Sequence, residues 1–487
     1  MATPIPLNNA RFTIEEIASA TRGTVMTMLP HYRVEVKGVT TDSRAVVPGG
    51  VFVALKGETH DGHAFLDSAA RKGAAVAIAL RGRGKEIDGL VVVEVDDTLV
   101  AWGDLAQAHL EKWREARSER RVVAITGSAG KTTTKELTAA LLAAVGSTHF
   151  TAGNLNNRIG VPSVVFALEE KHRFAVLEMG MSLPGELDAI TAFAPPDVSV
   201  VTNVGVAHAE GVGGREGVMK EKGAVYRALA RDGVAIVNAD DEFVQRAAEG
   251  TPAKRIVTFG RAEGARYRLV DRVSEGSGSR VTITRPGGAV TLFLPIPGEV
   301  AAIDLAAALA AQEAASDEIL SASAIEKALA SINLAGRSTV RKLARDIVLL
   351  DDTYNANPAS MRAALATLAE IGGSRRRVAI LGEMKELGPL AEEEHDALGD
   401  VLAESGVGLA IGCGGLATRI IERAKAKGLI EAIAAKDTAE AAKEAVARVK
   451  EGDAVLVKGS RGVAAERVVE ALVSWPDSAE SASSRLS

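Results

Sequence analysis

Residues 127–133 read GSAGKTT, so a lysine and two threonines directly follow a short stretch with two glycines. The apolar run VVAI precedes the stretch and a helical pattern follows it, which is the strand, turn and helix setting of a phosphate-binding loop. Gly127 and Gly130 allow the backbone to approach a phosphate, while helix amides and Lys131 supply positive charge. The Thr132 hydroxyl suits Mg²⁺. The pattern therefore predicts a site for ATP or GTP rather than a chance turn.

This loop has one glycine fewer than the common pattern G-x-x-x-x-G-K-[ST], which would place a glycine at Ile125. We expect Ser128, Ala129 and Thr133 to complete the nucleotide contacts of the loop. A nucleotide loop alone is compatible with an enzyme and with a switch protein that uses nucleotide only to change shape. A switch protein would need mobile loops and a partner surface.

Two polar residues follow apolar runs typical of strands in the same part of the chain. Glu178 ends FAVLE, and His208 follows VSVVTNV. The carboxyl ends of parallel strands form the edge at which open α/β sheets bind ligands, so both side chains could meet the nucleotide. The simpler alternatives are a glutamate that caps a neighbouring helix and a structural histidine.

Further charged residues follow strand-like runs near the C-terminus. Asp351 and Asp352 end IVLLDD, where they suit a ribose hydroxyl or a proton relay, or could cap a helix that starts near Pro358. The segment VKGSR, at 457–461, offers lysine and arginine donors for a carboxylate.

The elements that would position these residues fall into three groups. Residues 1–100 alternate short β-rich runs with short helices, residues 101–120 have the periodicity of a bridging helix, and residues 121–335 alternate strands and helices as in a parallel sheet. The runs YRLV, RVTIT and AVTLFLPI indicate an antiparallel insertion in this central domain. Residues 336–475 repeat the alternation as a Rossmann-like doubly wound domain, and residues 476–487 form a polar tail that we expect to be disordered. The fold class is thus α/β in three domains, the central one a P-loop ATPase domain.

Composition narrows the class of protein. The chain has 487 residues with 57 basic and 63 acidic side chains, a formal charge of −6, which argues against nucleic-acid binding and favours a small-molecule partner. The single cysteine, Cys413, excludes an internal disulfide framework and favours a reducing compartment. No run approaches the roughly 18 apolar residues of a membrane span, and no signal segment is evident at the start. We expect a cytoplasmic protein without membrane insertion.

Several longer motifs resemble those of the Mur ligase family, over about residues 40–462. In chain order they are TTDSR (40–44), GNLNNRIGVP (153–162), EMGM with PGE (178–186), TNVGVAH (202–208), KEKGAVY (220–226), NADD (238–241), LAGR (334–337), DDTYNANPASM (351–361), LGEMKELG (381–388) and VKGSRG (457–462). Within the family, DDTYNANP, VKGSR and GNLNNRIG are similar to ligases that add D-alanyl-D-alanine to UDP-MurNAc-tripeptide.

The resemblance implies an enzyme of cytoplasmic peptidoglycan precursor synthesis that uses ATP and Mg²⁺, the latter as two ions. ATP would phosphorylate the tripeptide carboxylate, and the acyl phosphate would accept the amine of D-Ala-D-Ala, releasing ADP and phosphate. The family suggests a monomer. Another Mur ligase and a folylpolyglutamate synthetase remain alternatives, although the N-terminal TDSR region disfavours the folate enzyme. The third peptide residue, diaminopimelate or lysine, stays open.

The resemblance also implies roles for individual residues. Lys131, Glu178, His208 and Lys222 would be catalytic, with Thr132, Glu178, His208 and a CO₂-derived carbamate on Lys222 as metal ligands. Lys222 is preferred over Lys220 because of its spacing to Tyr226. ATP would also contact Asp304, Arg337 and Asp352. The substrates would contact Thr41, Asp42, Ser43, Arg44, Asn156, Asn157, Asn355, Asn357, Lys458, Ser460 and Arg461.

Two departures from the family pattern concern the site. Val300 and Ala301 stand where the family has a histidine-asparagine stretch, which leaves the contact to adenine open, and Leu183 stands where related ligases often have histidine. Neither departure affects Lys131 or Glu178.

Overall fold

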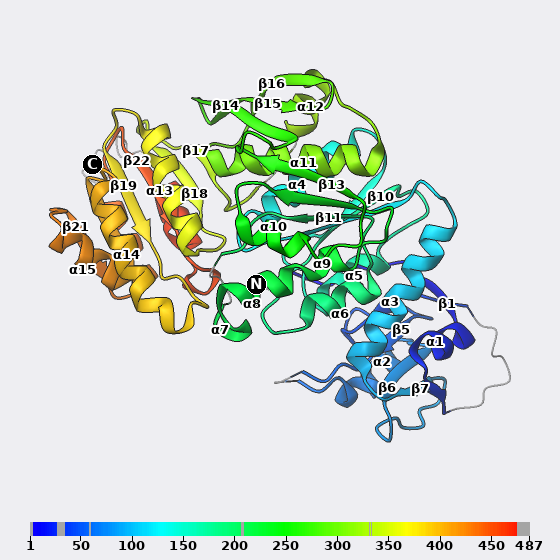
Figure 1. The fold of residues 1–487 in the computed structure, drawn as a ribbon. Helices are drawn as coiled ribbons and strands as arrows, with labels where there is room; N and C mark the ends of the chain where they lie inside the picture. The colour runs from blue at the N-terminus through cyan, green and yellow to red at the C-terminus, as the bar shows by residue number, and fades with distance from the viewer. Residues whose placement is uncertain are drawn as a thin grey trace, which may run out of the picture.

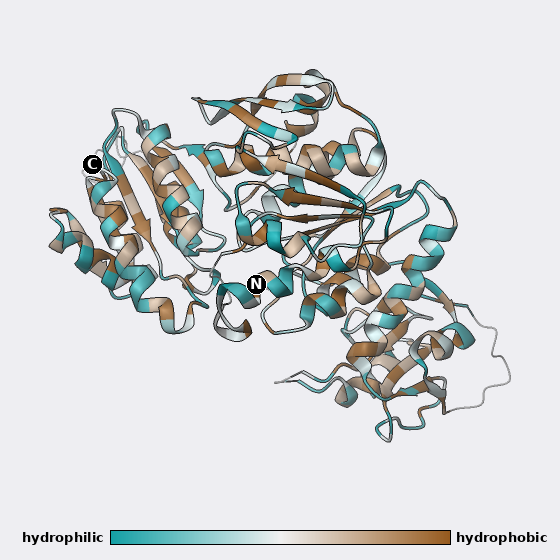
Figure 2. Ribbon diagram, viewed as in Figure 1, coloured by the Kyte–Doolittle hydropathy of each residue, from teal (hydrophilic) through white to brown (hydrophobic). Residues whose placement is uncertain are grey.

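A computed structural model describes residues 3–26, 35–57, 60–205, 209–330, 332 and 334–474. In that part of the chain, three α/β domains follow one another, each with its own main sheet (Figure 1). The N-terminal domain lies at one end of the molecule, the C-terminal domain at the other, and the nine-stranded sheet lies between them. Hydrophobic residues concentrate on the strands and on the helix faces turned toward them (Figure 2). The predicted three-domain α/β fold is confirmed.

The N-terminal domain is a small sheet in the order β2-β7-β6-β5-β4, parallel except for β2, beside a two-stranded ladder of β1 and β3. The elements are β1 (Arg11–Thr13), α1 (Ile14–Thr21), β2 (Thr24–Val25), β3 (Glu35–Lys37), β4 (Val39–Thr40), β5 (Val51–Val53), the 3₁₀ helix η1 (Gly62–Phe65), α2 (Leu66–Arg71), β6 (Val76–Leu80) and β7 (Val91–Val95). Thr13 and Glu16 form a capping box at the start of α1, which fixes where that helix begins.

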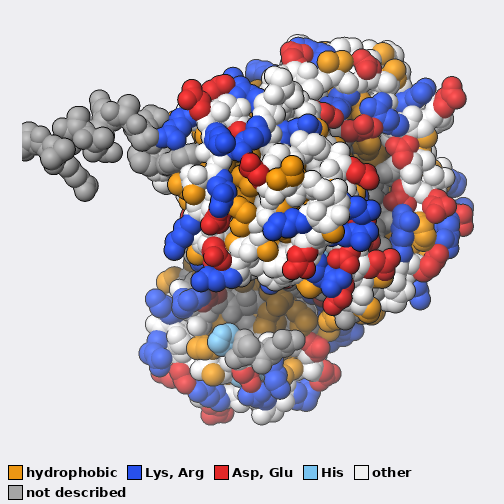
Figure 3. Space-filling model, turned by 90° about the vertical axis from the view of Figure 1, so that its left-hand side faces the viewer, with side chains coloured by type: hydrophobic (Ala, Val, Ile, Leu, Met, Phe, Trp, Pro, Cys, Tyr) orange, Lys and Arg blue, Asp and Glu red, His pale blue; other side chains and the backbone are white. Residues whose placement is uncertain are grey.

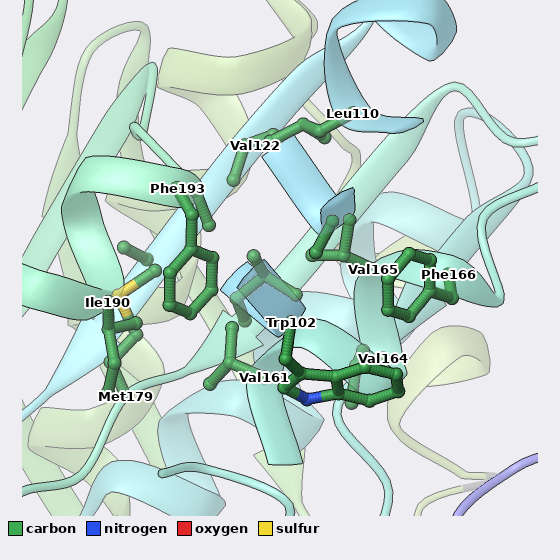
Figure 4. Packing of buried hydrophobic residues seen from close by; sticks show 14 of the residues in the cluster. Trp102, Leu110, Val122, Val161, Val164, Val165, Phe166, Met179, Ile190 and Phe193 are labelled. Atoms are coloured by element: carbon green, nitrogen blue, oxygen red, sulfur yellow. The ribbon is translucent and has the colours of Figure 1, made fainter. Parts of the chain in front are cut away.

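Helix α3 (Thr98–Glu115) joins this domain to the next. Asp97 starts it by accepting hydrogen bonds from the amides of Leu99 and Val100 at 2.7 and 3.1 Å. Its Trp102 is fully buried, donates from Nε1 to Ile159 O at 3.0 Å, and packs at a tilt against Phe166 with ring centroids 4.8 Å apart (Figure 4). One hydrophobic cluster therefore runs from the N-terminal sheet through α3 to one face of the central sheet.

The central sheet has nine strands in the order β16-β15-β14-β13-β12-β11-β8-β10-β9, parallel from β9 to β14. Its elements are β8 (Arg121–Thr126), α4 (Lys131–Ala143), β9 (Thr148–Phe150), α5 (Gly160–Phe166), β10 (Phe174–Glu178), α6 (Glu186–Phe193), β11 (Val198–Val201), α7 (Ala209–Val212), α8 (Gly214–Lys222), α9 (Ala224–Arg227), β12 (Val234–Asn238), α10 (Glu242–Ala248), β13 (Arg255–Gly260), β14 (Tyr267–Glu275), β15 (Gly278–Arg285), β16 (Gly288–Leu294), α11 (Glu299–Ser316) and α12 (Ala322–Leu329). The expected antiparallel segment, β14 to β16, forms, but it extends the main sheet because β14 pairs with β13.

The order of the central strands determines which segments meet at the carboxyl edge of the sheet. Strand β8 lies between β10 and β11, so the chain builds the sheet outward from β8 in both directions. Ile125 pairs with Glu178 on one side and with Val200 on the other. The segments that follow β8, β10 and β11 therefore meet at one point of the carboxyl edge, where open α/β sheets bind ligands.

The C-terminal domain has a sheet in the order β17-β18-β22-β19-β20-β21, parallel except for β17. Its elements are β17 (Thr339–Lys342), β18 (Val348–Asp352), α13 (Pro358–Gly372), β19 (Arg377–Leu381), η2 (Gly388–Leu390), α14 (Ala391–Glu404), β20 (Leu409–Cys413), α15 (Ala417–Ala426), β21 (Ala432–Ala435), α16 (Thr438–Arg448), β22 (Ala454–Lys458), η3 (Arg461–Val463) and α17 (Glu466–Val473). The expected tail, residues 476–487, lies outside the described residues. No helix in the described part of the chain has the length and apolar content needed to cross a bilayer.

Candidate functional site

The glycine-bearing loop follows β8 and needs both of its glycines. Gly127 has φ +153° and Gly130 has φ +79°. A Cβ on Gly127 would lie 1.8 Å from Thr202 Oγ1, and one on Gly130 would lie 2.6 Å from Asp304 Oδ1. Ile125, where the common pattern has glycine, is fully buried inside β8. The strand continues to Thr126, so the loop is shorter and has no place for the third glycine.

Two residues after β11 hold the loop in shape, and sequence reasoning gave neither a role. Asn203 accepts from the Ala129 amide at 2.9 Å and donates back to the Ala129 carbonyl at 3.0 Å. Thr202 Oγ1 donates to the same carbonyl at 2.5 Å. Ser128 Oγ accepts from the Gly205 amide at 2.8 Å. The only signal in the sequence was that TNVG follows a strand that ends at the same edge.

Lys131 opens helix α4, whose first amides have no partners within the helix and face the loop. Its Nζ donates to Gly127 O at 2.7 Å, so the side chain folds back over the loop. Desolvation lowers the pKa of Lys131, while the Glu178 carboxylate opposes that shift. A phosphate bound to the loop would give this ammonium group the counter-charge it lacks.

An oxygen-rich cluster lies next to Lys131. Thr132 Oγ1 donates to Glu178 Oε2 at 2.6 Å, and Asn156 Nδ2 donates to Glu178 Oε1 at 2.8 Å. Glu178 is 2% exposed, so its carboxylate is largely shielded from water. A hydroxyl and a carboxylate are the ligands that Mg²⁺ prefers, so the donor set fits this ion. His208 lies outside the described residues, and those residues hold no group of three or more His, Cys, Asp or Glu that could bind a metal.

Lys222 and Lys220 differ in environment. Lys220 is exposed, whereas Lys222, the last residue of α8, is 1% exposed and makes no ion pair with a carboxylate of the described residues. Burial, and then the charge of Lys131, lower the pKa of Lys222 well below its ordinary value. Tyr226 is also buried, and its hydroxyl donates to Ile236 O at 2.7 Å, which is a structural role. The structure thus buries Lys222 and leaves Lys220 exposed.

The residues expected near adenine and ribose come from both domains. Asp304 lies on α11 against Gly130, and burial raises its pKa to about 8. Val300 is largely exposed at the start of α11. Arg337 lies over the ring of Tyr354, with its guanidinium carbon 3.8 Å from the ring centroid. Among the smaller effects on Lys131 and Asp304, the charge of Arg337 lowers the pKa of each.

Asp352 is held by Lys458. The carboxylate accepts from Lys458 Nζ at 2.5 Å and from the Ser338 amide at 3.0 Å, and Lys458 also donates to Asn355 O at 2.9 Å. Lys458 is 2% exposed and lies beside Asp352. The neighbouring Asp351 is paired with Arg341 at 2.8 Å and is structural.

The asparagines of GNLNNRIGVP (153–162) and DDTYNANPASM (351–361) contact other parts of the protein. Asn157 Oδ1 accepts from the Gly160 amide at 2.8 Å at the start of α5. Asn357 caps α13 and donates from Nδ2 to Ser128 O at 3.3 Å, which joins the C-terminal domain to the loop. Asn355 is exposed, and Ser460 Oγ accepts from the Lys385 amide at 2.9 Å. Arg461 is exposed and lies over Tyr354, 5.2 Å from the ring centroid.

The segment Thr41, Asp42, Ser43 and Arg44 follows β4 in the N-terminal domain. Asp42 accepts hydrogen bonds from Arg44 Nε and NH2, and the Arg44 side chain is 88% exposed. Ser43 is buried and Thr41 is half-buried. This segment is distant in the fold from the loop after β8. In Figure 3 the surface is hollowed between the N-terminal domain, below, and the rest of the molecule.

A separate cavity of about 360 Å³ lies at the other edge of the central sheet, between the starts of β13 and β14 and the last turns of α11. It contains none of the predicted site residues. The polar side chains of the candidate site converge instead at the carboxyl edge of the central sheet.

Three family models match the chain in order. They are "Mur ligase family, catalytic domain" over residues 35–110, "Mur ligase middle domain" over 125–312, and "Mur ligase, glutamate ligase domain" over 336–461. Among curated proteins, the UDP-N-acetylmuramoyl-tripeptide–D-alanyl-D-alanine ligase of Escherichia coli K12 is 36% identical, over 89% of this chain and 93% of that protein. The ligase of the same name from Bacillus subtilis 168 is 34% identical, over 95% of this chain and 99% of that protein.

Solved structures give the same result. A crystal structure of MurF from Acinetobacter baumannii matches with a TM-score of 0.84 and 31% identity, covering 96% of this chain and 99% of that one. MurF ligase from Thermotoga maritima in complex with ADP matches with a TM-score of 0.79 and 30% identity, covering 90% and 97%. A folylpolyglutamate synthase from Mycobacterium tuberculosis matches at 17% identity and a TM-score of 0.61, which reflects the shared fold alone.

Proposed function

Because the chain belongs to the Mur ligase family, we propose that it is an ATP-dependent amide ligase that joins D-alanyl-D-alanine to UDP-N-acetylmuramoyl-tripeptide. The observation that supports this most directly is the meeting of two domains beside the phosphate loop. The phosphate loop lies on one side, with Lys131, and Arg337 and Asp352 lie on the other. The Asn357 contact to Ser128 O, at 3.3 Å, closes the two sides around one site.

The chemistry requires a carboxylate to become a good acyl donor. The tripeptide carboxylate attacks the γ-phosphorus of ATP, an O–P bond forms, the bond to the β-phosphate oxygen breaks, and ADP leaves. The dipeptide amine then attacks the acyl carbon, phosphate leaves, and the nitrogen loses a proton. Both steps concentrate negative charge beside Lys131, whose ammonium group and the α4 amides would stabilise it.

Metal binding is part of this proposal. Thr132 and Glu178 supply the oxygen ligands described above, and His208 would add a further ligand by resemblance. Bound Mg²⁺, of which we propose two ions, would supply neutralisation of phosphate charge. Arg337 and Asp352 would hold ATP, with Asp304 at its adenine side. Thr41 to Arg44 would hold the uridine nucleotide.

We also propose that Lys222 is carbamylated by CO₂. A buried lysine beside a second cation favours the neutral amine, which is the form that reacts with CO₂. The carbamate would replace a buried cation by an anion able to bind a metal.

Lys222→Ala should lower the rate of phosphate release, and added short carboxylic acids should restore part of that rate. The matched control is Lys220→Ala, two residues away and exposed, which should keep the wild-type rate. Full activity of Lys222→Ala would remove the carbamate from the mechanism.

The dipeptide would bind on the C-terminal side, near Asn355, Asn357, Ser460 and Arg461, and the tripeptide near Asn156 and Asn157. The relatives' names support the two substrates. We propose a monomeric, cytoplasmic enzyme, in line with the one buried cysteine and the absence of an expected membrane span.

The function is tested by phosphate release from ATP. Release should require UDP-MurNAc-tripeptide and D-Ala-D-Ala together, and the variant Lys131→Ala should be slower by at least about 100-fold because a transition-state cation is lost. Release with a folate and glutamate in their place would favour the folylpolyglutamate alternative. Nucleotide hydrolysis that ignores D-Ala-D-Ala would contradict the proposal.

A further inference from the structure

The ring of Tyr354 is approached by two arginines that come from different segments. The guanidinium carbon of Arg337 is 3.8 Å from the ring centroid of Tyr354, and that of Arg461 is 5.2 Å from it. Both distances fall within the roughly 6 Å range of a cation–π interaction. The Tyr354 hydroxyl makes no hydrogen bond with any of the described residues. Among the described residues, the Tyr354 side chain therefore contacts the two arginines through its aromatic ring.

The two arginines serve different sides of the site. Arg337 lies in the turn that leads from the central domain to the C-terminal domain, and it is close enough to Lys131 and Asp304 to shift their pKa values. Arg461 opens η3, directly after β22, and its side chain is exposed on the C-terminal side. Two guanidinium groups near one point repel each other, and the electron-rich face of a ring offsets part of that repulsion.

The backbone around Tyr354 fixes the same turn. The Tyr354 amide donates to Gly336 O at 2.9 Å, and Asp352 accepts from the Ser338 amide at 3.0 Å. Gly336 has φ +69°, which favours glycine in that turn. These backbone contacts do not depend on the Tyr354 side chain. A substitution of Tyr354 can therefore remove the ring while the hydrogen bonds of the turn remain.

We propose that Tyr354 is a positioning residue that holds Arg337 toward the ATP phosphates and Arg461 toward the carboxylate of the incoming dipeptide. This inference rests on the proposed function. Because one ring contacts both side chains, an anion that orders one arginine also orders the ring against which the other packs. Binding of the dipeptide should therefore strengthen binding of the nucleotide, and the reverse must hold by linkage.

The first test compares Tyr354→Leu with Tyr354→Phe. Loss of the ring in the leucine variant should raise the KM for ATP and the KM for D-Ala-D-Ala by about five-fold to ten-fold each, with a smaller change in kcat. Phenylalanine keeps the ring face and should restore both KM values to within about two-fold of wild type. A residue that only supported the fold would lower kcat and thermal stability without this split. Unchanged KM values in the leucine variant would overturn the proposal.

The second test asks whether the ring couples the two arginines. In the wild-type background, Arg461→Ala should raise the KM for ATP by about three-fold. In the Tyr354→Leu background, the same substitution should leave the KM for ATP unchanged. Equal effects in both backgrounds would contradict coupling through the ring.

A calorimetric titration with Mg·ADP separates this proposal from the proposed function. Tyr354→Leu should weaken ADP binding without any peptide substrate, because Arg337 is no longer held. If ADP binding is unchanged while dipeptide-dependent phosphate release persists, the Tyr354 proposal fails and the ligase function stands. If wild-type phosphate release ignores the dipeptide while ADP binding falls in the leucine variant, the ligase function and the Arg461 part fail, and the hold on Arg337 stands.

Discussion

The central domain is joined to its two neighbours in different ways. On the N-terminal side, a single apolar cluster includes residues of the first sheet, of α3 and of the central domain, among them Phe12, Trp102 and Phe166. On the C-terminal side, the two clusters under the last sheet contain only residues of that domain. The joint there includes polar contacts, such as Arg272 with Glu370 at 2.6 Å and Asn357 with Ser128 at 3.3 Å.

This difference indicates which joint can open. An apolar joint is stable because separation exposes buried surface to water, whereas polar contacts can exchange for contacts with water at little cost. The residues proposed to contact ATP lie on both sides of the polar joint, Lys131 on one and Asp352 on the other. We infer that the N-terminal and central domains form one rigid unit and that the C-terminal domain moves against it when substrates bind.

The largest expected effect is on the apolar joint. Trp102→Ala removes a fully buried indole and its hydrogen bond to Ile159 O, so it should lower the free energy of unfolding by about 3–5 kcal/mol. Denaturant unfolding measures this loss. The control is Val100→Ala on the same helix, where the side chain is exposed and the change should stay within about 0.5 kcal/mol. Similar losses in both variants would mean that this cluster does not join the domains.

The polar joint should respond through function rather than stability. Glu370→Ala leaves the 9% exposed Arg272 side chain without its partner and should weaken docking by about 1–2 kcal/mol. The KM for ATP should then rise by about five-fold to thirty-fold, with a larger radius of gyration in small-angle scattering. The control Glu404→Ala changes an exposed glutamate of the same domain. If both variants scatter alike and bind ATP alike, the Arg272 contact does not hold the domain in place.

The smallest expected effect is a loss of stability of the unit formed by the N-terminal and central domains in mild acid. Burial, and then the charge of the adjacent His149, lower the pKa of His172 to about 4. The unfolded chain, with a histidine pKa of about 6.5, therefore binds more protons than the folded chain between these values. Thermal stability should be complete above about pH 6.5 and fall as the pH drops toward 4. His172→Gln should have a flatter dependence in that window, and an identical dependence would assign the loss to other groups.

Local patterns in the sequence predicted much of this architecture. The strand, turn and helix around Lys131 was expected from its residues, and so was the helix that became α3. The reason for the missing glycine was not predictable, because the burial of Ile125 depends on its pairing with β10 and β11. Nor could periodicity show that α3 would share its apolar face between two domains.

The roles of individual polar residues were harder to predict. The sequence did not show that Lys458, at the end of β22, would pair with Asp352, which is 106 residues away. Nor did the sequence show that Asn157 and Asn357 would accept hydrogen bonds from backbone amides at helix starts. The burial of Lys222 depends on how α8 packs, because its own helix is rich in charged residues. Such contacts are set by tertiary structure, which no local pattern contains.

The shared core also has a consequence for the order of events during synthesis. The apolar cluster that joins the N-terminal sheet to α3 also includes Phe193, which is 78 residues beyond the end of α3. At about 5–20 residues per second, the ribosome needs roughly 4–16 s to make that interval. During that time the nascent first domain has an unfinished apolar surface. Completion of its core therefore depends on the central domain, and a fragment that ends at Glu115 should be less stable than the same residues within the full chain.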